Sequence, residues 1–187
     1  MRIISGTARG HRLATFSTQT IRPTPDRVRE AVFNMLVSRI GPLDGLRVLD
    51  LFAGSGAMGI EALSRGADYA VFVDPAREAG RLIERNLRHC RLEGRARLIQ
   101  RAAASALTEL GSEHFDLVFL DPPYHSRLAG ELIEALTSRD LLSPGAWLVV
   151  ETDSKEEPTP RPSGIDLDVE RRFGRIRIEL LRKGETL

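Results

Sequence analysis

Cysteine is nearly absent from this chain, since Cys90 is the only one among 187 residues. One cysteine excludes an intramolecular disulfide and a metal cluster built on thiolates, and it suits a reducing compartment. The sequence also lacks any run of the roughly 18 apolar residues that a membrane-spanning helix requires, and no apolar targeting segment opens it. We therefore expect a cytoplasmic protein without a membrane partner.

Net charge is also nearly absent, because 27 Lys and Arg residues are balanced by 26 Asp and Glu residues. The balance is uneven along the chain: residues 1–40 carry seven arginines against Asp26 and Glu30 only. Such a local excess suits a phosphate-rich partner such as a nucleic acid, with a merely solvated basic face as the alternative. The length fits one domain with a sizeable core.

Residues 41–187 alternate short apolar runs with helical segments, which predicts an α/β fold whose parallel sheet is covered by helices on both faces. The expected strands span 48–52, 70–73, 97–99, 115–120 and 147–150, and the expected helices span 57–65, 77–90, 103–110 and 127–137. Residues 152–168 are rich in Pro, Ser and charge and predict a loop. Polar and apolar residues alternate over 169–173 and 176–181, which predicts a terminal antiparallel hairpin.

Residues 1–40 are too few for a core of their own, and we expect them to form an N-terminal extension. The extension opens with a predicted hairpin around Gly6 to Gly10. Thr24 can cap a helix that has Pro25 at its first position, and apolar residues then recur at helical spacing until Gly41-Pro42. We expect an amphipathic helix with arginines on its outer face.

A glycine-rich loop from Asp50 to Gly59 joins the first expected strand to its helix, and its glycines permit close approach of the backbone to a ligand. Asp74 ends the next strand, where a carboxylate can hold both hydroxyls of a ribose. A dinucleotide and S-adenosylmethionine both fit such a site, but the Asp50 carboxylate repels a pyrophosphate and suits an ammonium group. The alternative is a loop that only packs helix on strand. The candidate cofactor-binding residues here are Asp50, Phe52, Ala53, Gly54, Ser55, Gly56, Gly59 and Asp74.

The tetrapeptide Asp121-Pro122-Pro123-Tyr124 follows the apolar strand 115–120 and predicts a site for an exocyclic amino group. Asp121 and the Pro122 carbonyl can accept hydrogen bonds from an NH2 group. The prolines fix φ and lack an N–H, so the turn is stiff, and Tyr124 offers a flat face for stacking a base. The alternative is an ordinary proline-rich turn. In a doubly wound sheet the strands before Asp50 and Asp121 are neighbours, so cofactor and acceptor would meet in one crevice.

The sequence resembles the bacterial 16S ribosomal RNA guanine-N2 methyltransferase family over almost its whole length. The resemblance is carried by Arg2-Ile3-Ile4 with Gly6 and Arg9-Gly10, by Arg22 to Glu30 with Phe33-Asn34, by Asp50 to Gly59 with Glu61-Ala62, and by Asp121 to Tyr124. It implies a Rossmann-like class I methyltransferase fold, a mixed sheet of order 3-2-1-4-5-7-6 with strand 7 antiparallel. It also implies S-adenosylmethionine as methyl donor and guanine N2 as acceptor.

The resemblance implies a role for each motif. Asp50 and the glycine loop would hold the methionine end of the donor, Asp74 its ribose, and the turn from Asp121 to Tyr124 the flipped guanine. Members of the family often carry Asp or Asn where this chain has Ala102-Ala103, so adenine recognition at Ala103 would rest on backbone groups. The chain has no visible appended RNA-binding domain, so from its size we expect the partner to be 16S ribosomal RNA within the assembled small subunit. We also expect the protein to act as a monomer and without a metal ion. Contacts with the RNA phosphates are expected from Arg9, Arg12, Arg22, Arg27 and Arg29.

Other functions fit parts of the pattern. A DNA adenine-N6 methyltransferase can use the same Asp-Pro-Pro-Tyr turn, but no target-recognition domain is visible and the Arg22 to Glu30 motif favours RNA. A non-catalytic RNA-binding assembly factor could share the fold, although the carboxylates at the strand ends argue against it. A protein-amide methyltransferase and a dehydrogenase fit less well. The histidines show no metal-ligand spacing, and we expect Glu151, which follows the strand 147–150, to be peripheral.

Overall fold

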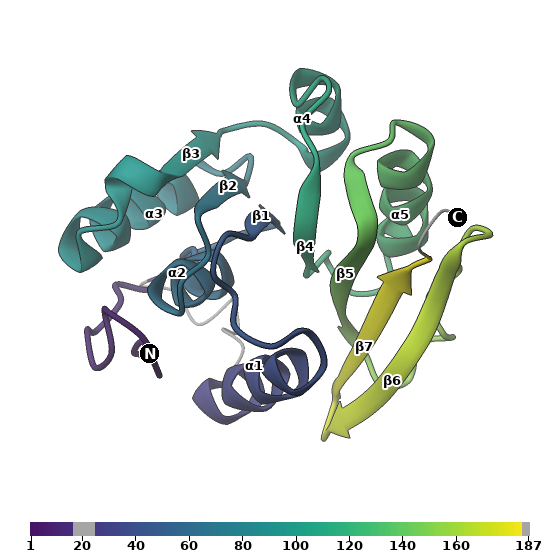
Figure 1. Cartoon of the computed structure of the whole chain (residues 1–187), viewed down its shortest axis with the longest axis horizontal. Coiled ribbons are helices and arrows are strands. Elements are labelled where there is room, and N and C mark those ends of the chain that lie inside the picture. The colour runs from purple at the N-terminus through teal and green to yellow at the C-terminus, as the bar shows by residue number, and fades with distance from the viewer. Residues whose placement is uncertain (17–24, 185–187) are drawn as a thin grey trace.

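A seven-stranded sheet of order β3-β2-β1-β4-β5-β7-β6 forms the centre of the protein (Figure 1). This computed structural model describes residues 1–16 and 25–184. Strands β1 to β5 run parallel to one another, and β7 is antiparallel to both β5 and β6. The order and directions of the strands confirm the class I methyltransferase topology that the resemblance implies.

The boundaries of most elements agree with the sequence pattern to within a residue or two. The strands are β1 Arg47–Leu51, β2 Tyr69–Val73, β3 Ala96–Ile99, β4 Phe115–Leu120, β5 Leu142–Asp153, β6 Ile165–Phe173 and β7 Ile176–Lys183. The helices are α1 Asp26–Ile40, α2 Ala57–Ser64, α3 Arg77–Cys90, α4 Ala103–Glu109 and α5 Leu128–Ser138, with a 3-10 turn η1 at Glu93–Arg95.

The sheet divides the apolar interior into two cores. Side chains alternate along a strand, so Val48 of β1 packs with α1, α2 and α3 on one face, while Leu49 and Leu51 pack with α4 and α5 on the other. Figure 1 shows α1 and α2 on one side of the sheet and α4 and α5 on the opposite side. The same alternation continues just beyond the end of a strand. A residue there faces the same side of the sheet as the residue two positions before it.

The N-terminal extension is docked on the α2 side of the sheet. Its chain doubles back through an antiparallel bridge between Arg2 and Arg12, which confirms the predicted hairpin around Gly6 to Gly10. The buried carboxylate of Glu61 in α2 accepts hydrogen bonds from the backbone N–H groups of Ile4 and Ser5, at 2.8 and 3.0 Å. The extension thus shares its core with the rest of the chain.

The clearest differences from the sequence pattern are at the start of α1, at both ends of β5, which spans Leu142–Asp153, and at the start of β6. Helix α1 begins at Asp26, with Pro25 just before it, and the predicted cap Thr24 lies outside the described residues. The predicted loop 152–168 is shorter than expected, because β5 continues to Asp153 and β6 begins at Ile165. The polar end of β5 stays extended since it pairs with β7 as far as Asp153 opposite Ile176, and this pairing outweighs local composition.

Candidate active site

Carboxylates gather at the carboxyl edge of the parallel strands. Leu51 of β1 is in register with Val73 of β2 and Leu120 of β4, and Leu120 is in register with Val150 of β5. Acidic residues follow Val73, Leu120 and Val150, and another precedes Leu51. These carboxylates belong to Asp50, Asp74, Asp121 and Glu151. Each lies two residues after a side chain in the core beneath α1, α2 and α3, so the alternation assigns all of them to that face.

The glycine loop forms a tight passage from β1 into α2. Gly56 has φ 78°, in the left-handed region that glycine enters at little cost, and it directly precedes the helix. Gly59 permits close packing, because a Cβ atom there would lie 2.4 Å from Cε1 of Phe72. Phe52 adopts φ 62°, a conformation uncommon for an aromatic residue, and such outliers concentrate at functional sites. The loop is therefore shaped by requirements beyond joining the two elements.

Asp50 lies buried beneath this loop. Its side-chain oxygen Oδ2 accepts a hydrogen bond from the Gly59 backbone N–H at 2.8 Å, and the residue is 3% exposed. Burial raises the pKa of Asp50 to about 7, the Gly59 hydrogen bond opposes this shift, and the negative charge of Asp74 adds to it. A buried carboxylate held in this way gains stability when a cation is placed beside it.

Asp74 connects the end of β2 to the glycine loop. Its Oδ2 atom accepts the Gly54 backbone N–H at 2.9 Å, and its Oδ1 atom accepts the Ala76 N–H at 2.9 Å. Each carboxylate oxygen can accept more than one hydrogen bond, so capacity remains for the hydroxyl groups of a ligand. The structure thus brings Asp74 and the glycine loop together, as the sequence predicts.

The Asp121 to Tyr124 turn follows β4, next to β1. Asp121 is accessible to solvent, yet protein atoms surround much of its carboxylate, and this desolvation raises its pKa well above the usual value. The negative charges of Glu151 and Asp50 raise it further. Pro122 is buried, and Tyr124 is 41% exposed, so part of this residue is accessible to a partner.

Glu151 is part of this site, and our expectation that it is peripheral was wrong. The residue is 9% exposed, and its Oε1 atom lies 3.4 Å from the hydroxyl group of Tyr124, which donates to it. Desolvation raises the pKa of Tyr124, and the charge of Glu151 is the next cause. The sequence signal for Glu151 is an acid directly after an apolar run, here 147–150, and Asp74 and Asp121 carry the same signal.

The segment between β5 and β6 packs against the turn. Glu156 accepts the backbone N–H of His125 at 3.0 Å, directly after Tyr124. The buried guanidinium of Arg177 in β7 holds this segment by donating to the Glu156 and Glu157 carbonyl oxygens, both at 2.6 Å. The proposed amino-group turn is therefore supported from β7 through an ordered segment.

The arginines predicted to contact RNA differ in their exposure to solvent. Arg9, Arg12 and Arg27 are exposed, and Arg22 lies outside the described residues. The prediction for Arg29 was wrong, because its side chain is fully buried and donates hydrogen bonds to the Arg2 carbonyl and to Asp26. Desolvation lowers the pKa of Arg29, while the charges of Asp26 and Glu61 oppose the shift. Arg29 supports the fold and is unavailable to a phosphate.

Two residues of this region had no signal in the sequence. Asn86 in α3 is buried, and its side-chain amide bonds both to Ala14 of the extension and to the Ser55 carbonyl of the glycine loop. Phe16 lies over the same loop, since a Cβ atom on Gly54 would be 3.7 Å from its ring. Ala103, the predicted adenine-binding position, begins α4 and is buried.

Across residues 1–16 and 25–184, no group of three or more His, Cys, Asp or Glu side chains is arranged to hold a metal ion. In the same part of the chain, no helix is both long and apolar enough to cross a membrane.

Comparisons with known proteins agree with this geometry. The family model described as "Conserved hypothetical protein 95" matches residues 1–182. The chain is 36% identical to "Ribosomal RNA small subunit methyltransferase D" of Haemophilus influenzae, with 96% of this chain and 92% of that protein covered. The solved structure of "Putative methyltransferase yhhF from Escherichia coli" superimposes with a TM-score of 0.88 at 32% identity, covering 100% of this chain and 99% of that one.

A more distant protein, SMU.776, was solved complexed with SAH; it shares the fold at a TM-score of 0.65 and 15% identity, over 83% of this chain and 48% of that one. At that identity the likeness concerns the fold alone. The family match, by contrast, spans nearly the whole sequence and both halves of the candidate site. The chain therefore belongs to the family described as "Conserved hypothetical protein 95".

Proposed function

We propose that this protein transfers a methyl group from S-adenosylmethionine to the exocyclic N2 of a guanine in small-subunit ribosomal RNA. One observation carries the proposal: β1 and β4 are adjacent, so Asp50 and the glycine loop lie beside the Asp121 to Tyr124 turn. The name of the Haemophilus influenzae relative supports ribosomal RNA as the substrate class. The choice of guanine N2 rests on the family resemblance of the sequence.

The residues at the strand ends fit the proposed methyl donor. Asp50 is a buried carboxylate without a cationic partner among the described residues, which suits the ammonium group of a methionine moiety. Asp74 already fixes the Gly54 backbone and retains acceptor capacity for ribose hydroxyls. The adenine would lie near the start of α4, where Ala103 offers only backbone groups. When bound, the donor supplies a methyl group activated by the positive charge on sulfur.

The acceptor site holds an amino group rather than activating it strongly. The Asp121 carboxylate and the Pro122 carbonyl accept hydrogen bonds from the NH2 group and fix its orientation. Pro122 and Pro123 restrict the backbone, so the acceptors are positioned before the base arrives. Stacking on Tyr124 contributes roughly 1 to 3 kcal/mol toward holding a base outside its stack.

The raised pKa of Asp121 gives the turn a second function. An amino nitrogen that gains a methyl group must lose a proton, and a carboxylate with a raised pKa accepts a proton more readily than an ordinary one. Glu151 contributes to this property through its charge and also accepts a hydrogen bond from the Tyr124 hydroxyl. Asp121 therefore orients the amino group and can receive its proton.

The extension would contact RNA beside the catalytic part of the chain. Exposed Arg9, Arg12 and Arg27 are suited to phosphates and carry no base specificity. RNA bases are recognised most readily where they are already splayed from a helix, and a target guanine must leave its stack to reach Tyr124. We therefore propose the assembled small subunit, in the cytoplasm, as the partner that presents the base.

The substrate assignment is tested by transfer of a radiolabelled methyl group to three acceptors: small ribosomal subunits, naked ribosomal RNA and DNA. Nucleoside analysis of the product identifies the modified atom. The expected product is N2-methylguanosine in ribosomal RNA, with the assembled subunit as the better substrate. N6-methyladenine in DNA would replace the proposal by the DNA methyltransferase alternative, and equal labelling of naked and assembled RNA would contradict the role of the subunit.

A further inference from the structure

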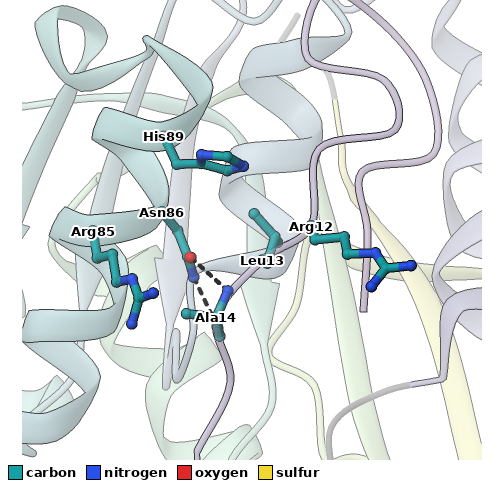
Figure 2. A pocket seen from close by; sticks show the side chains of 6 residues that line it. All are labelled: Arg12, Leu13, Ala14, Arg85, Asn86 and His89. Carbon is teal, nitrogen blue, oxygen red and sulfur yellow. Dashed lines mark hydrogen bonds between the residues drawn. The ribbon is translucent and has the colours of Figure 1, made fainter.

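A hollow separates the N-terminal extension from α3 (Figure 2). Its volume is about 430 Å³, and its walls come from two parts of the chain that are far apart in sequence. The extension contributes Arg12, Leu13 and Ala14, and α3 contributes Arg85, Asn86 and His89. We call this site the basic hollow.

The two arginines of the basic hollow, Arg12 and Arg85, are exposed, and neither side chain has a hydrogen bond or ion pair with another described residue. Figure 2 shows their guanidinium groups on opposite sides of Ala14. The His89 ring lies at the rim, 5.1 Å from the His11 ring in an edge-to-face arrangement. None of the described residues that line the hollow is acidic, so its chemistry suits an anion.

The floor of the basic hollow is rigid. The Asn86 Oδ1 atom accepts the Ala14 N–H at 2.8 Å, and its Nδ2 atom donates to the carbonyl oxygens of Ala14 and Ser55, at 3.0 and 2.9 Å. Both N–H donors of this amide and its oxygen are satisfied in the interior. Arg12 lies two residues before Ala14, whose backbone these bonds fix. The chain therefore loses less conformational entropy when Arg12 holds a ligand.

The positive charge continues along α3. Arg77, Arg81 and Arg88 are exposed on the same helix and have no ion pair with another described residue. From Arg77 to Arg85 the helix rises about 12 Å, so these side chains could follow an extended chain of phosphates. Glu78 and Glu84 are the acidic residues of α3, and Glu84 lines a second hollow with Arg77 and Arg81. The arginines outnumber these acids on the outer face of the helix.

The basic hollow adjoins the proposed donor site. The same Asn86 amide that forms its floor holds the Ser55 carbonyl of the glycine loop. Farther along the extension, Phe16 lies over Gly54. The arginines of α3 begin three residues after Asp74, at the other end of the donor site. An RNA strand bound along α3 would therefore pass directly beside the cofactor.

We propose that the basic hollow is a phosphate-binding subsite for the backbone of the RNA substrate, in which Arg12 and Arg85 hold phosphates from opposite walls. Arginine suits this task because its planar guanidinium can donate two parallel hydrogen bonds to phosphate oxygens. The inference rests on the proposed function for the identity of the polymer. It adds α3 to a contact surface that the sequence assigned to the extension alone.

The test compares R12A/R85A with the unchanged protein in binding to a fluorescent small-subunit ribosomal RNA transcript over a series of salt concentrations. Each phosphate contact contributes about 0.7 to 0.9 to the slope of log affinity against log salt. The double variant should reduce the magnitude of the slope by about 1.4 to 1.8 if each arginine holds one phosphate. R12K/R85K should restore most of the slope, because lysine keeps the charge.

The matched control is R139A/R171A, which removes two exposed arginines at the end of α5 and on the edge strand β6. Thermal unfolding and calorimetric binding of S-adenosylhomocysteine should be unchanged in both double variants, which establishes that the fold and donor site are intact. If the slope of log affinity against log salt for R12A/R85A equals that of the control, the proposed phosphate subsite is wrong. The proposed function would not be affected by that result. Absence of methyl transfer to ribosomal RNA by the unchanged protein would instead overturn the proposed function.

Discussion

The Asp74 carboxylate accepts a hydrogen bond from the Gly54 backbone N–H at 2.9 Å, which fastens the end of β2 to the loop that follows β1. This contact gives Asp74 two functions. It is the proposed ligand of the donor ribose, and it also holds the glycine loop in the conformation that the donor requires. Substitution of Asp74 should therefore affect donor binding both directly and through the loop.

Asp74→Ala should weaken binding of S-adenosylhomocysteine by roughly 1.5 to 3 kcal/mol, the range for hydrogen bonds to a charged group. Isothermal calorimetry measures the change directly. Asp68→Ala is a suitable control, because Asp68 is an exposed acid at the opposite end of the same strand. Equal affinities in the two variants would remove Asp74 from the donor site.

Donor binding should release protons through Asp50. The pKa of Asp50 is about 7 in the free protein, so below that pH the carboxylate is largely protonated. An ammonium group beside it favours the charged form, so donor affinity should rise with pH up to about 7 and then level off. Calorimetry at about pH 6 in buffers of different ionisation enthalpy measures the proton release. Asp50→Asn keeps an acceptor for Gly59 and should abolish the release; an unchanged release would exclude Asp50 as its source.

The same shift predicts the pH dependence of stability without donor. Because the folded-state pKa of Asp50 is raised, the folded protein binds this proton more tightly than the unfolded chain. The contribution of Asp50 to the free energy of unfolding is thus fully present below about pH 4 and is lost as pH rises through about 7. Denaturant unfolding should show a smaller decline over this window in Asp50→Asn. Parallel curves for the two proteins would contradict the raised pKa.

Asn86→Ala should weaken both folding and donor binding. The substitution leaves the backbone groups of Ala14 and the Ser55 carbonyl without their partner, at about 1 to 3 kcal/mol of unfolding free energy per unsatisfied buried group. Donor affinity should fall in the folded variant, since the glycine loop loses its connection to α3. Asn34→Ala, at an exposed position of α1, is the control. Full donor affinity in Asn86→Ala would show that the connection is only structural.

Glu151→Gln should change the pH profile of methyl transfer. The charge of Glu151 raises the pKa of Asp121, so removing it should lower that pKa and move the acidic limb of the rate profile to lower pH. The glutamine retains a hydrogen-bond acceptor for the Tyr124 hydroxyl. Glu134→Gln, on the exposed side of α5, should leave the profile unchanged. An acidic limb at the same pH in Glu151→Gln would mean that the two carboxylates do not interact.

The sequence signal that led to Asp74 and Asp121 is an acid at the end of an apolar run. Asp74 and Asp121 each follow a continuous apolar run, and parallel strands place all such positions along one edge of a sheet. The sheet order depends on contacts between strands that are distant in sequence, and it was obtained only through the family resemblance. Glu151 carried the same signal as Asp74 and Asp121, and it was missed because it precedes a polar segment that looks like a loop.

Other features depend on tertiary contacts that no local pattern reveals. Arg29 is a charged residue on a helix, where exposure is the usual expectation, yet its side chain is buried, and one guanidinium nitrogen donates to both the Arg2 carbonyl and the Asp26 carboxylate. Asn86 is one polar residue in a helix with many, and its partners Ala14 and Ser55 lie 72 and 31 residues away along the chain. Burial and pairing at this range follow only from the folded structure.

We propose above all that the Asp121 to Tyr124 turn holds the methyl acceptor beside a separate donor site. The most direct test measures two quantities in Asp121→Ala: its affinity for S-adenosylhomocysteine by calorimetry, and its rate of radiolabelled methyl transfer to small ribosomal subunits. We predict nearly unchanged affinity with methyl transfer abolished. Retained turnover in Asp121→Ala would contradict the proposed role of the turn in holding the acceptor.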